Sequence, residues 1–332
     1  MSRSSRVAYV HPDKFKAVFP TLKPTVYNDP NTARTPGNLR TIAWNPVGTW
    51  VATGCTDKTL RVWNVDKPNV RQSTELKGHT ASIEKVAFNP VKELELCSVS
   101  SDGTVKFWDV RTRNIINEVK GLGEAFTLAW APDGESLVVG NKADTLFVLS
   151  PTQSTPLSTH QQSVQTNNLT FCWSGKRIYA TTSEGYTRIL TYPSLEPAFL
   201  YSYKDPKDAE MKLHGHTSAC TTVELHPMSR FLATGGTDSL ISLWDTEEWN
   251  CQRTITKMVG PIKSISFSFD GHCIVGGSDE GNAMEFHSCE TGEHLFTYKT
   301  ASPCPLVAWA PNRYALAYCE LGTLRIISAG AK

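Results

Sequence analysis

Short apolar stretches separated by turn residues repeat along nearly the whole chain. Each unit has a strand that ends in an aromatic residue or Leu, a turn, a second apolar strand, another turn, and a third strand that often ends in Trp. Helix-length periodic stretches are lacking, which excludes an α-solenoid. Seven copies are found, and their first strands end at Trp44, Phe88, Trp130, Phe171, Leu225, Phe267 and Trp309.

The spacing of these anchor residues predicts the architecture. They lie 41 to 44 residues apart, except for one interval of 54 residues between Phe171 and Leu225. The turn after the first anchor, Asn45-Pro46-Val47-Gly48, places Pro and Gly where a type I turn favours them. Units of this length are typical of four-stranded propeller blades. We expect an all-β, seven-bladed propeller over residues 37–328, between an extension (1–36) and a tail (329–332).

Gly-His and Trp-Asp pairs within the copies resemble those of the WD40 family, and the resemblance covers nearly everything from Gly37 to Ser328. Two copies also carry the family's buried tetrad, in which indole, hydroxyl, imidazole and carboxylate can form one hydrogen-bonded chain. These tetrads are His79, Ser98, Asp102 and Trp108 in the second copy and His216, Thr234, Asp238 and Trp244 in the fifth. The other copies have lost part or all of the tetrad, so we expect their blades to depend on apolar packing.

The seventh copy ends with its third strand, so its fourth strand must come from elsewhere. The N-terminus is the donor that remains, and WD propellers commonly close in this way. We expect the closing strand near residues 15–20 (FKAVFP), paired with Gly322 to Ser328, because closure protects the strand edges. The Pro-rich stretch from Thr21 to Pro36 is then a long loop that enters the first blade.

Charge and cysteine content narrow the possible functions. The 33 Lys and Arg residues nearly balance the 32 Asp and Glu residues, so bulk charge favours neither nucleic acid nor a membrane surface. No apolar run approaches the length of a membrane span, and we expect a soluble, intracellular protein. The nine cysteines are scattered singly, which argues against a disulfide framework or a zinc knuckle.

His79, Ser98 and Asp102 are the residue types of a hydrolytic triad, but the same set recurs at His216 with nearly equal spacing. Such repetition indicates architecture, since a nucleophile needs an exposed hydroxyl at a strained turn. Phosphate-binding and zinc-hydrolase motifs are also lacking. The sequence therefore predicts no catalytic, cofactor-binding or metal-binding residues and no small-molecule substrate.

The family resemblance places a candidate binding surface on the narrow face around the central channel. WD40 proteins usually hold peptides or partner domains there, and the position four before each anchor lies on that face. In this chain the positions are Arg40, Glu84, Phe126, Asn167, Thr221, Lys263 and Pro305. An exposed Phe126 beside Arg40 and Lys263 could anchor a partner segment. The alternative is that Phe126 packs inward and the charges are only solvated.

Two irregular segments are further candidates for partner contacts. The long interval contains the charged stretch 203–213 (YKDPKDAEMKL), which is either a docking loop or a solvated one. The start Ser2-Arg3-Ser4-Ser5-Arg6 is short and basic, and it either touches RNA weakly or is an ordinary disordered terminus.

Several segments resemble the WD-repeat subunit of the THO complex, including VGNKADT, ILTYPSLEP and TASPCPLVAWAPNRYALAY. This similarity departs at the N-terminal extension and at residues 203–213. It implies a nuclear, non-catalytic scaffold in the THO/TREX assembly, which couples transcription to mRNA processing and export. The implied partners are the large helical scaffold subunit and other THO subunits, with mRNA and export factors associated indirectly.

Two other functions stay open at this stage. Trp108-Asp109-Val110-Arg111 matches the W-D-x-R element of substrate receptors for cullin-RING ubiquitin ligases, although that tetrapeptide is common in WD repeats. A histone-peptide reader would instead need an acidic or aromatic pocket in the channel, for which the ring offers Glu84 and Phe126.

Overall fold

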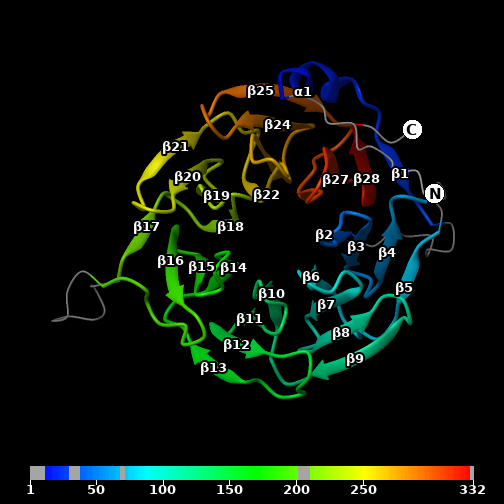
Figure 1. Cartoon of the computed structure of the whole chain (residues 1–332), viewed down its shortest axis with the longest axis vertical. Helices are drawn as coiled ribbons and strands as arrows, with labels where there is room; N and C mark the ends of the chain where they lie inside the picture. The colour runs from blue at the N-terminus through cyan, green and yellow to red at the C-terminus, as the bar shows by residue number, and fades with distance from the viewer. Residues whose placement is uncertain (1–11, 30–37, 68–71, 201–209, 330–332) are drawn as a thin grey trace, which may run out of the picture.

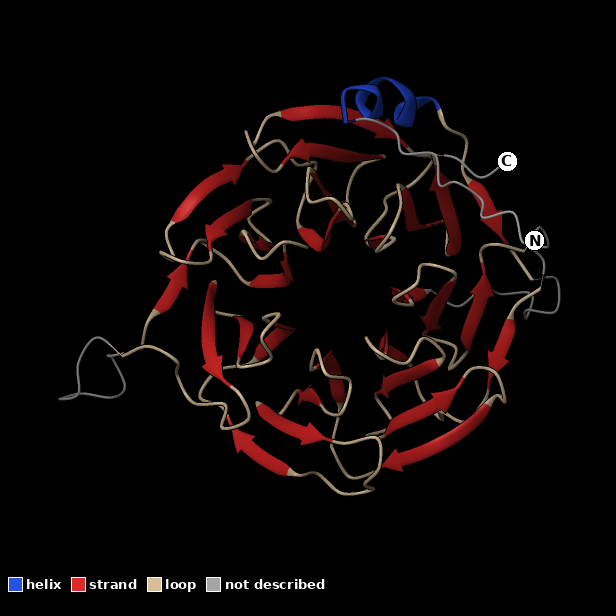
Figure 2. Ribbon diagram, in the orientation of Figure 1, coloured by secondary structure: helices blue, strands red, loops and turns tan. Residues whose placement is uncertain are grey.

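Seven four-stranded antiparallel sheets surround a central opening in the computed structural model, which describes residues 12–29, 38–67, 72–200 and 210–329 (Figures 1 and 2). Each sheet is one blade, with its first strand beside the opening and its fourth at the rim. The predicted seven-bladed β-propeller is therefore confirmed.

The strands follow the chain in order around the ring. Blade one contains β2 (Leu39–Trp44), β3 (Trp50–Cys55), β4 (Leu60–Asn64) and β5 (Thr74–Leu76), and blade two contains β6 (Ile83–Phe88), β7 (Glu95–Ser100), β8 (Val105–Asp109) and β9 (Asn114–Val119). Blade three contains β10 (Ala125–Trp130), β11 (Leu137–Asn141), β12 (Thr145–Leu149) and β13 (Ser158–Gln161), and blade four contains β14 (Thr166–Phe171), β15 (Arg177–Thr182), β16 (Tyr186–Thr191) and β17 (Lys212–His214). Blade five contains β18 (Cys220–Leu225), β19 (Phe231–Gly236), β20 (Ile241–Asp245) and β21 (Cys251–Ile255), and blade six contains β22 (Ile262–Phe267), β23 (Cys273–Ser278), β24 (Ala283–Ser288) and β25 (His294–Lys299). Blade seven contains β26 (Val307–Trp309), β27 (Ala315–Glu320), β28 (Thr323–Ser328) and β1 (Thr25–Tyr27).

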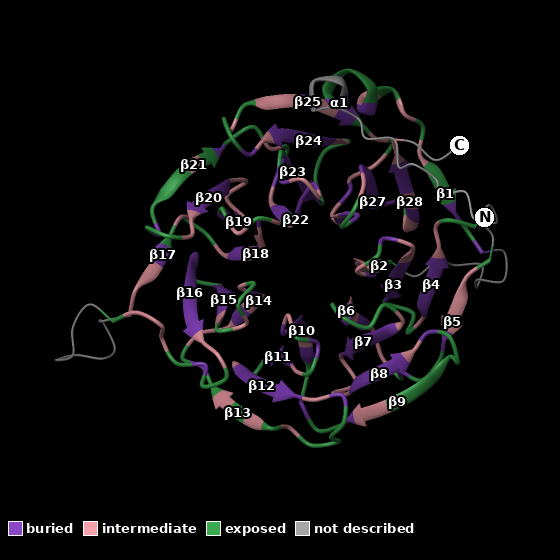
Figure 3. Ribbon diagram, viewed as in Figure 1, coloured by how far each residue is buried: buried purple, intermediate pink, exposed green. Residues whose placement is uncertain are grey.

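The core lies between neighbouring blades. Every residue of the second strands β7, β11, β19 and β23 is buried, because each such strand has a blade packed on both of its faces (Figure 3). Strands buried on both faces have nearly continuous apolar sequences rather than an alternating pattern. The outer strands β9 and β21 carry exposed residues at the rim.

The N-terminus supplies the outer strand of blade seven. Strand β1 pairs antiparallel with β28, with Thr25 opposite Ile326 and Tyr27 opposite Leu324. The expected closing strand at residues 15–20 is wrong, however, since that stretch forms helix α1 (Pro12–Val18) and the short 3-10 helix η1 (Phe19–Thr21). Phe15 and Phe19 are four residues apart, and this spacing suits one face of a helix.

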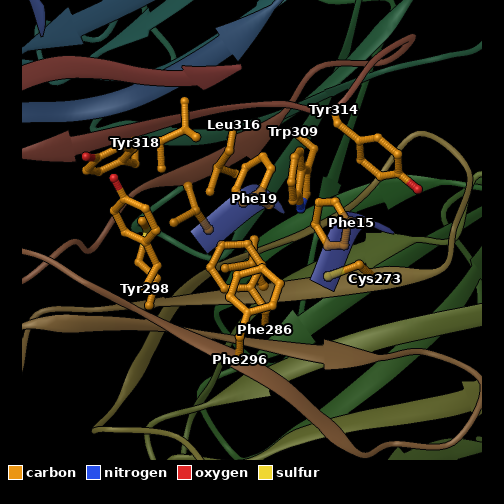
Figure 4. Packing of buried hydrophobic residues seen from close by; sticks show 14 of the residues in the cluster. Phe15, Phe19, Cys273, Phe286, Phe296, Tyr298, Trp309, Tyr314, Leu316 and Tyr318 are labelled. Atoms are coloured by element: carbon orange, nitrogen blue, oxygen red, sulfur yellow. The ribbon is translucent and has the colours of Figure 1, made fainter. Parts of the chain in front are cut away.

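Both phenylalanines fill the space between blades six and seven (Figure 4). Phe15 is 4% exposed and Phe19 is fully buried. The Phe15 ring stacks on Tyr314 at 4.6 Å between centroids, and Phe19 lies 5.1 Å from Trp309 and 5.8 Å from Phe286. Helix α1 therefore joins the last two blades from the rim, where it lies beside β25 in Figure 1.

The same N-terminal segment also reaches blade one. The Asp29 carboxylate accepts hydrogen bonds from the Ser73 hydroxyl (2.7 Å) and the Ser73 N–H (3.2 Å), and it lies 3.5 Å from the Arg61 guanidinium. Residues 15–29, which we name the N-terminal clasp, thus contact blades six, seven and one in turn.

The charged stretch 203–213 does not form a loop throughout. Residues 201–209 lie outside the described part of the chain, as does the basic start Ser2–Arg6. Lys212 and Leu213 belong to β17, the outer strand of blade four, so the end of this stretch is part of the propeller. Just before it, the Glu210 carboxylate pairs with Arg188 at 2.6 Å, and both side chains are 9% exposed.

The clasp makes a testable contribution to stability. Phe19→Ala should lower the free energy of unfolding by about 3–5 kcal/mol, because it leaves a cavity between two blades. The neighbouring variant Val18→Ala is the control, since Val18 is 39% exposed. Urea unfolding followed by circular dichroism measures both, and equal midpoints for the two variants would contradict the proposed packing.

Candidate functional site

A central channel of about 710 Å³ lies within the ring and is lined by residues from all seven inner strands and from five of the turns that follow them. All inner strands run in the same direction along the channel. We name the end where they begin the top mouth, and the end where they finish the bottom mouth.

The ring expected at the top mouth coincides with a backbone irregularity in six blades. In each, the pairing of the inner strand with the second strand shifts register by one residue, as between Leu39 and Thr41 in blade one. The residue left over is the extra residue of a β-bulge, which re-aims its side chain. These residues are Arg40, Glu84, Phe126, Asn167, Thr221 and Lys263; Pro305 instead precedes β26.

The charged members of this ring are paired within the chain. Arg40 lies 3.1 Å from Glu84, which also accepts a hydrogen bond from the Ser101 hydroxyl at 2.8 Å. Lys263 lies 3.1 Å from Asp279. The top mouth therefore presents ion pairs rather than free charges of one sign.

The uncharged members have internal contacts as well. Asn167 donates to the Cys220 carbonyl at 2.8 Å, and Thr221 donates to the Ile262 carbonyl at 2.5 Å. Phe126 is partly buried. Arg40, Glu84, Asn167, Thr221 and Lys263 line the channel.

Hydrogen bonds between adjacent inner strands hold the channel wall. The Thr41 hydroxyl accepts the Val86 N–H (3.2 Å), the Ser264 hydroxyl accepts the Val307 N–H (2.9 Å), and the Ser266 hydroxyl accepts the Trp309 N–H (3.1 Å). Each bond joins a side chain of one blade to the backbone of the next. The wall is therefore held by fixed contacts, which suits a preformed binding surface.

Four of the seven turns at the bottom mouth carry an exposed apolar side chain, a feature that the sequence analysis missed. These side chains are Val47 (40% exposed), Val91 (63%), Trp173 (61%) and Met228 (75%), and we name them the bottom patch. All four lie in the turns that follow inner strands, in blades one, two, four and five. The corresponding turns of blades three, six and seven carry Asp133, Asp270 and Asn312. The repeat alignment would have revealed this contrast.

Trp173 is the largest side chain of the bottom patch, and its orientation is fixed. The indole N–H donates to the His226 carbonyl of blade five at 3.3 Å. The ring therefore reaches across the boundary between blades four and five, toward the turn that carries Met228. An exposed Trp that is already oriented loses little conformational freedom when a partner binds.

The two tetrads form continuous hydrogen-bonded chains. In blade two, the Trp108 indole donates to the Ser98 hydroxyl (2.8 Å), which contacts His79 Nε2 (2.7 Å), while His79 Nδ1 contacts Asp102 (3.0 Å). In blade five the same three distances are 3.0, 2.9 and 3.1 Å for Trp244, Thr234, His216 and Asp238. An ionised carboxylate fixes the proton on Nδ1, so that Nε2 accepts from the hydroxyl.

The tetrad of blade two is organised for stability. Burial lowers the pKa of His79, which keeps the imidazole neutral. Burial alone would raise the pKa of Asp102, but hydrogen bonds from the Thr104 hydroxyl, the Thr80 N–H and His79 together hold it well below its usual range. Ser98 is fully buried between His79 and Trp108, so its hydroxyl is not available as a surface nucleophile.

Blade six has a different residue at each tetrad position. His287 pairs with Ile274 as Trp244 pairs with Leu232, so it takes the place of the tryptophan. It is 1% exposed, and within the described residues neither ring nitrogen has a hydrogen-bond partner. Burial lowers its pKa to about 4, and the charge of His294 acts in the same direction.

Neither a metal site nor a membrane-spanning helix occurs in the described residues. No group of three or more His, Cys, Asp or Glu side chains there could hold a metal ion, and no helix there could cross a membrane. All nine cysteines are free thiols, and seven are buried.

Comparison with known proteins agrees with this geometry. The family description "WD domain, G-beta repeat" matches residues 31–64, 70–109 and 208–245. The propeller domain of Cps50 (Swd1) from Myceliophteria thermophila superposes with a TM-score of 0.75 at 16% identity, over 93% of this chain and all of that one. The chain is a WD40 β-propeller.

Full-length relatives define the family more closely. THO complex subunit 3 of Arabidopsis thaliana is 30% identical over 282 residues, which span 84% of this chain and 85% of that protein. WD repeat-containing protein AAC3 of Dictyostelium discoideum is 32% identical over 249 residues, or 69% of this chain and 51% of that protein. This chain belongs to the WD-repeat family that includes THO complex subunit 3.

The tetrad geometry predicts the effect of removing its carboxylate. Asp102→Ala should lower the free energy of unfolding by about 2–3 kcal/mol, because the buried His79 N–H loses its acceptor. Asp57→Ala in blade one is the matched control. Asp57 is exposed and, among the described residues, accepts hydrogen bonds from Thr59 alone, so its removal should change stability by less than about 0.5 kcal/mol. Thermal unfolding compares them, and a melting temperature unaffected by Asp102→Ala would refute the structural role.

His287 predicts a pH dependence of stability. Its pKa is lower in the folded chain, about 4 against an ordinary 6.5, so the unfolded chain binds the proton more tightly. The contribution of neutral His287 to the free energy of unfolding is therefore fully present above pH 6.5, and it is lost as the pH drops from 6.5 toward 4. Between pH 7.5 and 5.5 the wild type should lose roughly 1 kcal/mol more than His287→Phe. Urea unfolding at both pH values tests this, and parallel losses would show that His287 is not responsible.

Proposed function

We propose that the chain is a non-catalytic scaffold subunit of a THO-type complex. The observation that carries the proposal is the 30% identity to THO complex subunit 3, which extends over 85% of that protein. A match of this extent includes most blades and most connecting turns. By its name that relative belongs to a complex, and we extend the membership to this chain.

In this role the chain acts in the nucleus, within the assembly that couples transcription to mRNA processing and export. Its near balance of 33 basic and 32 acidic side chains supports contacts with protein rather than direct contacts with RNA. The partners are the large helical scaffold subunit and other THO subunits, and mRNA and export factors associate indirectly. The function requires no cofactor and no active site.

The bottom patch is the surface that we assign to the main protein contact. Exposed apolar residues that gather in one place mark interaction sites, and Trp and Met are enriched in interfaces. The charged residues of the top mouth are held in ion pairs within the chain, whereas the side chains of the bottom patch are exposed.

The first experiment is affinity purification of the tagged chain from nuclear extract after nuclease treatment, followed by mass spectrometry. We expect stoichiometric recovery of THO subunits, which would show that protein contacts hold the chain in the complex. Recovery of cullin-ligase adaptors, or of nothing after nuclease treatment, would overturn the proposal. Binding of histone-tail peptides would favour the reader function instead.

The patch assignment predicts a selective loss of partners. The double variant Trp173→Ser and Met228→Ser should reduce recovery of THO subunits at least tenfold, while the chain stays folded despite loss of the Trp173 bond to His226. A matched control is Ile116→Ser with Leu157→Ser, because these residues are 51% and 49% exposed but lie away from both mouths, on β9 and beside β13. Equal recovery with the two double variants would exclude the bottom patch as the docking surface.

A further inference from the structure

A second polar feature lies inside the channel, where the ring of hydrogen bonds between neighbouring inner strands is interrupted. In blade two, the position of Thr41 and Ser264 is occupied by Lys85, and in blade four by Asn168. Lys85 Nζ crosses the channel and donates to Asn168 Oδ1 at 2.5 Å. A cation from one blade is thus held by a neutral amide two blades away.

The Asn168 amide is fixed in the orientation that receives this lysine. Its Oδ1 also accepts the Leu169 N–H at 2.9 Å, and its Nδ2 points to the Thr222 hydroxyl at 3.4 Å. These contacts direct an oxygen rather than an NH₂ group at Lys85. Lys85, Asn168 and Thr222 all line the channel, so they form a polar cluster that a ligand can reach.

Lys85 differs from the other cations of the channel in its partners. Arg40 is paired with Glu84, and Lys263 is paired with Asp279. Lys85 makes no ion pair with any residue that the structure describes, and only one of its three N–H donors is used by Asn168. Burial without a counter-ion lowers its pKa to about 8, although the charge of Glu224 opposes this.

Glu224 shares the channel but does not neutralise Lys85. Its carboxylate accepts hydrogen bonds from the Ser266 hydroxyl (3.2 Å) and the Phe267 N–H (3.1 Å) of blade six. Burial raises the pKa of Glu224 to about 8, against the lowering effect of these two hydrogen bonds and of the charge of Lys85. Among the described residues, Lys85 therefore has a neutral hydrogen-bond partner and no carboxylate within ion-pair distance.

We propose that Lys85 and Asn168 form a binding site for a single carboxylate, supplied by a partner segment that enters the channel from the top mouth. A carboxylate would form a charge-assisted hydrogen bond with the desolvated ammonium. A monoanion matches the single ammonium of Lys85, whereas a phosphate would bring a second negative charge that has no further cation in the cluster. The proposal rests on the proposed scaffold function only in that a protein partner supplies the group.

The test follows the backbone amides of residues 85 and 168 by NMR in the full-length chain. The probes are the capped peptide acetyl-Gly-Glu-Gly-amide, its Gln analogue, and acetyl-Gly-Gly-Gly with a free C-terminal carboxylate. We expect saturable shifts at pH 7 with at least one of the two carboxylate peptides and none with the Gln peptide. The tighter binder identifies the source as an acidic side chain or a chain terminus.

The variants locate the binding. Lys85→Gln should weaken binding at least tenfold, and Asn168→Asp should do the same because it supplies an internal carboxylate to Lys85. Lys120→Gln is the control, since this lysine is 71% exposed in its side chain and pairs with Glu118 away from the channel. Melting temperatures show whether each variant is folded. If Lys85→Gln does not fold, Asn168→Asp still tests the binding site.

Binding should also depend on pH. Titration of Lys85 from pH 7 to 9 should weaken binding about tenfold, since its pKa is about 8. Ionisation of Glu224 acts in the same direction. The other charged groups that line the channel are Arg40, Glu84 and Lys263, which are held in the ion pairs described above.

Absence of saturable shifts with both carboxylate peptides, an equal response to the Gln peptide, or unchanged binding by folded Lys85→Gln would overturn the carboxylate site. These outcomes are independent of the purification experiment. Failure to recover THO subunits would overturn the proposed function. Peptide binding by the purified chain tests only the carboxylate site, and its result does not depend on that recovery.

Discussion

Closure of the ring is the constraint on which the rest of the structure depends. Each blade buries its faces only against its neighbours, so an opening at any point would expose apolar strands on both sides. The chain prevents this with its N-terminal clasp, which places two phenylalanines between blades six and seven, completes the sheet of blade seven with β1, and ties Asp29 to blade one. Three blades are thereby held by one short segment.

A closed ring gives fixed positions to groups that come from distant parts of the sequence. Bulges in six inner strands re-aim the residues of the top mouth, and the charged ones among them are held in ion pairs within the chain. The turns at the opposite end present the bottom patch, with Trp173 oriented by its bond to blade five. Between the two mouths, Lys85 reaches Asn168 across the channel. The two surfaces that we propose for binding are thus at separate places on one frame.

The repeat made the architecture predictable, since anchors at regular spacing and two complete tetrads are local features of the sequence. Where the closing strand lies was not predictable in the same way. Residues 15–20 are as apolar as a strand, and only the pocket between blades six and seven selects a helix that buries Phe15 and Phe19 together. Likewise β17 lies at the end of a charged stretch, and its place is set by pairing with β16. The state of the site residues was harder still to predict, because it depends on side chains from other blades. Those side chains decide whether Arg40 is paired and whether Lys85 has a counter-ion.

The contacts of the N-terminal clasp imply that it holds blades six, seven and one together. Hydrogen exchange measured by mass spectrometry on the full chain and on a chain that lacks residues 1–29 tests it most directly. We predict that the deletion removes protection from β28, β25 and β4 while β11 and β15, on the far side of the ring, change least. Equal protection of β28 in the two chains would contradict the account, since it would mean that the ring stays closed without its clasp.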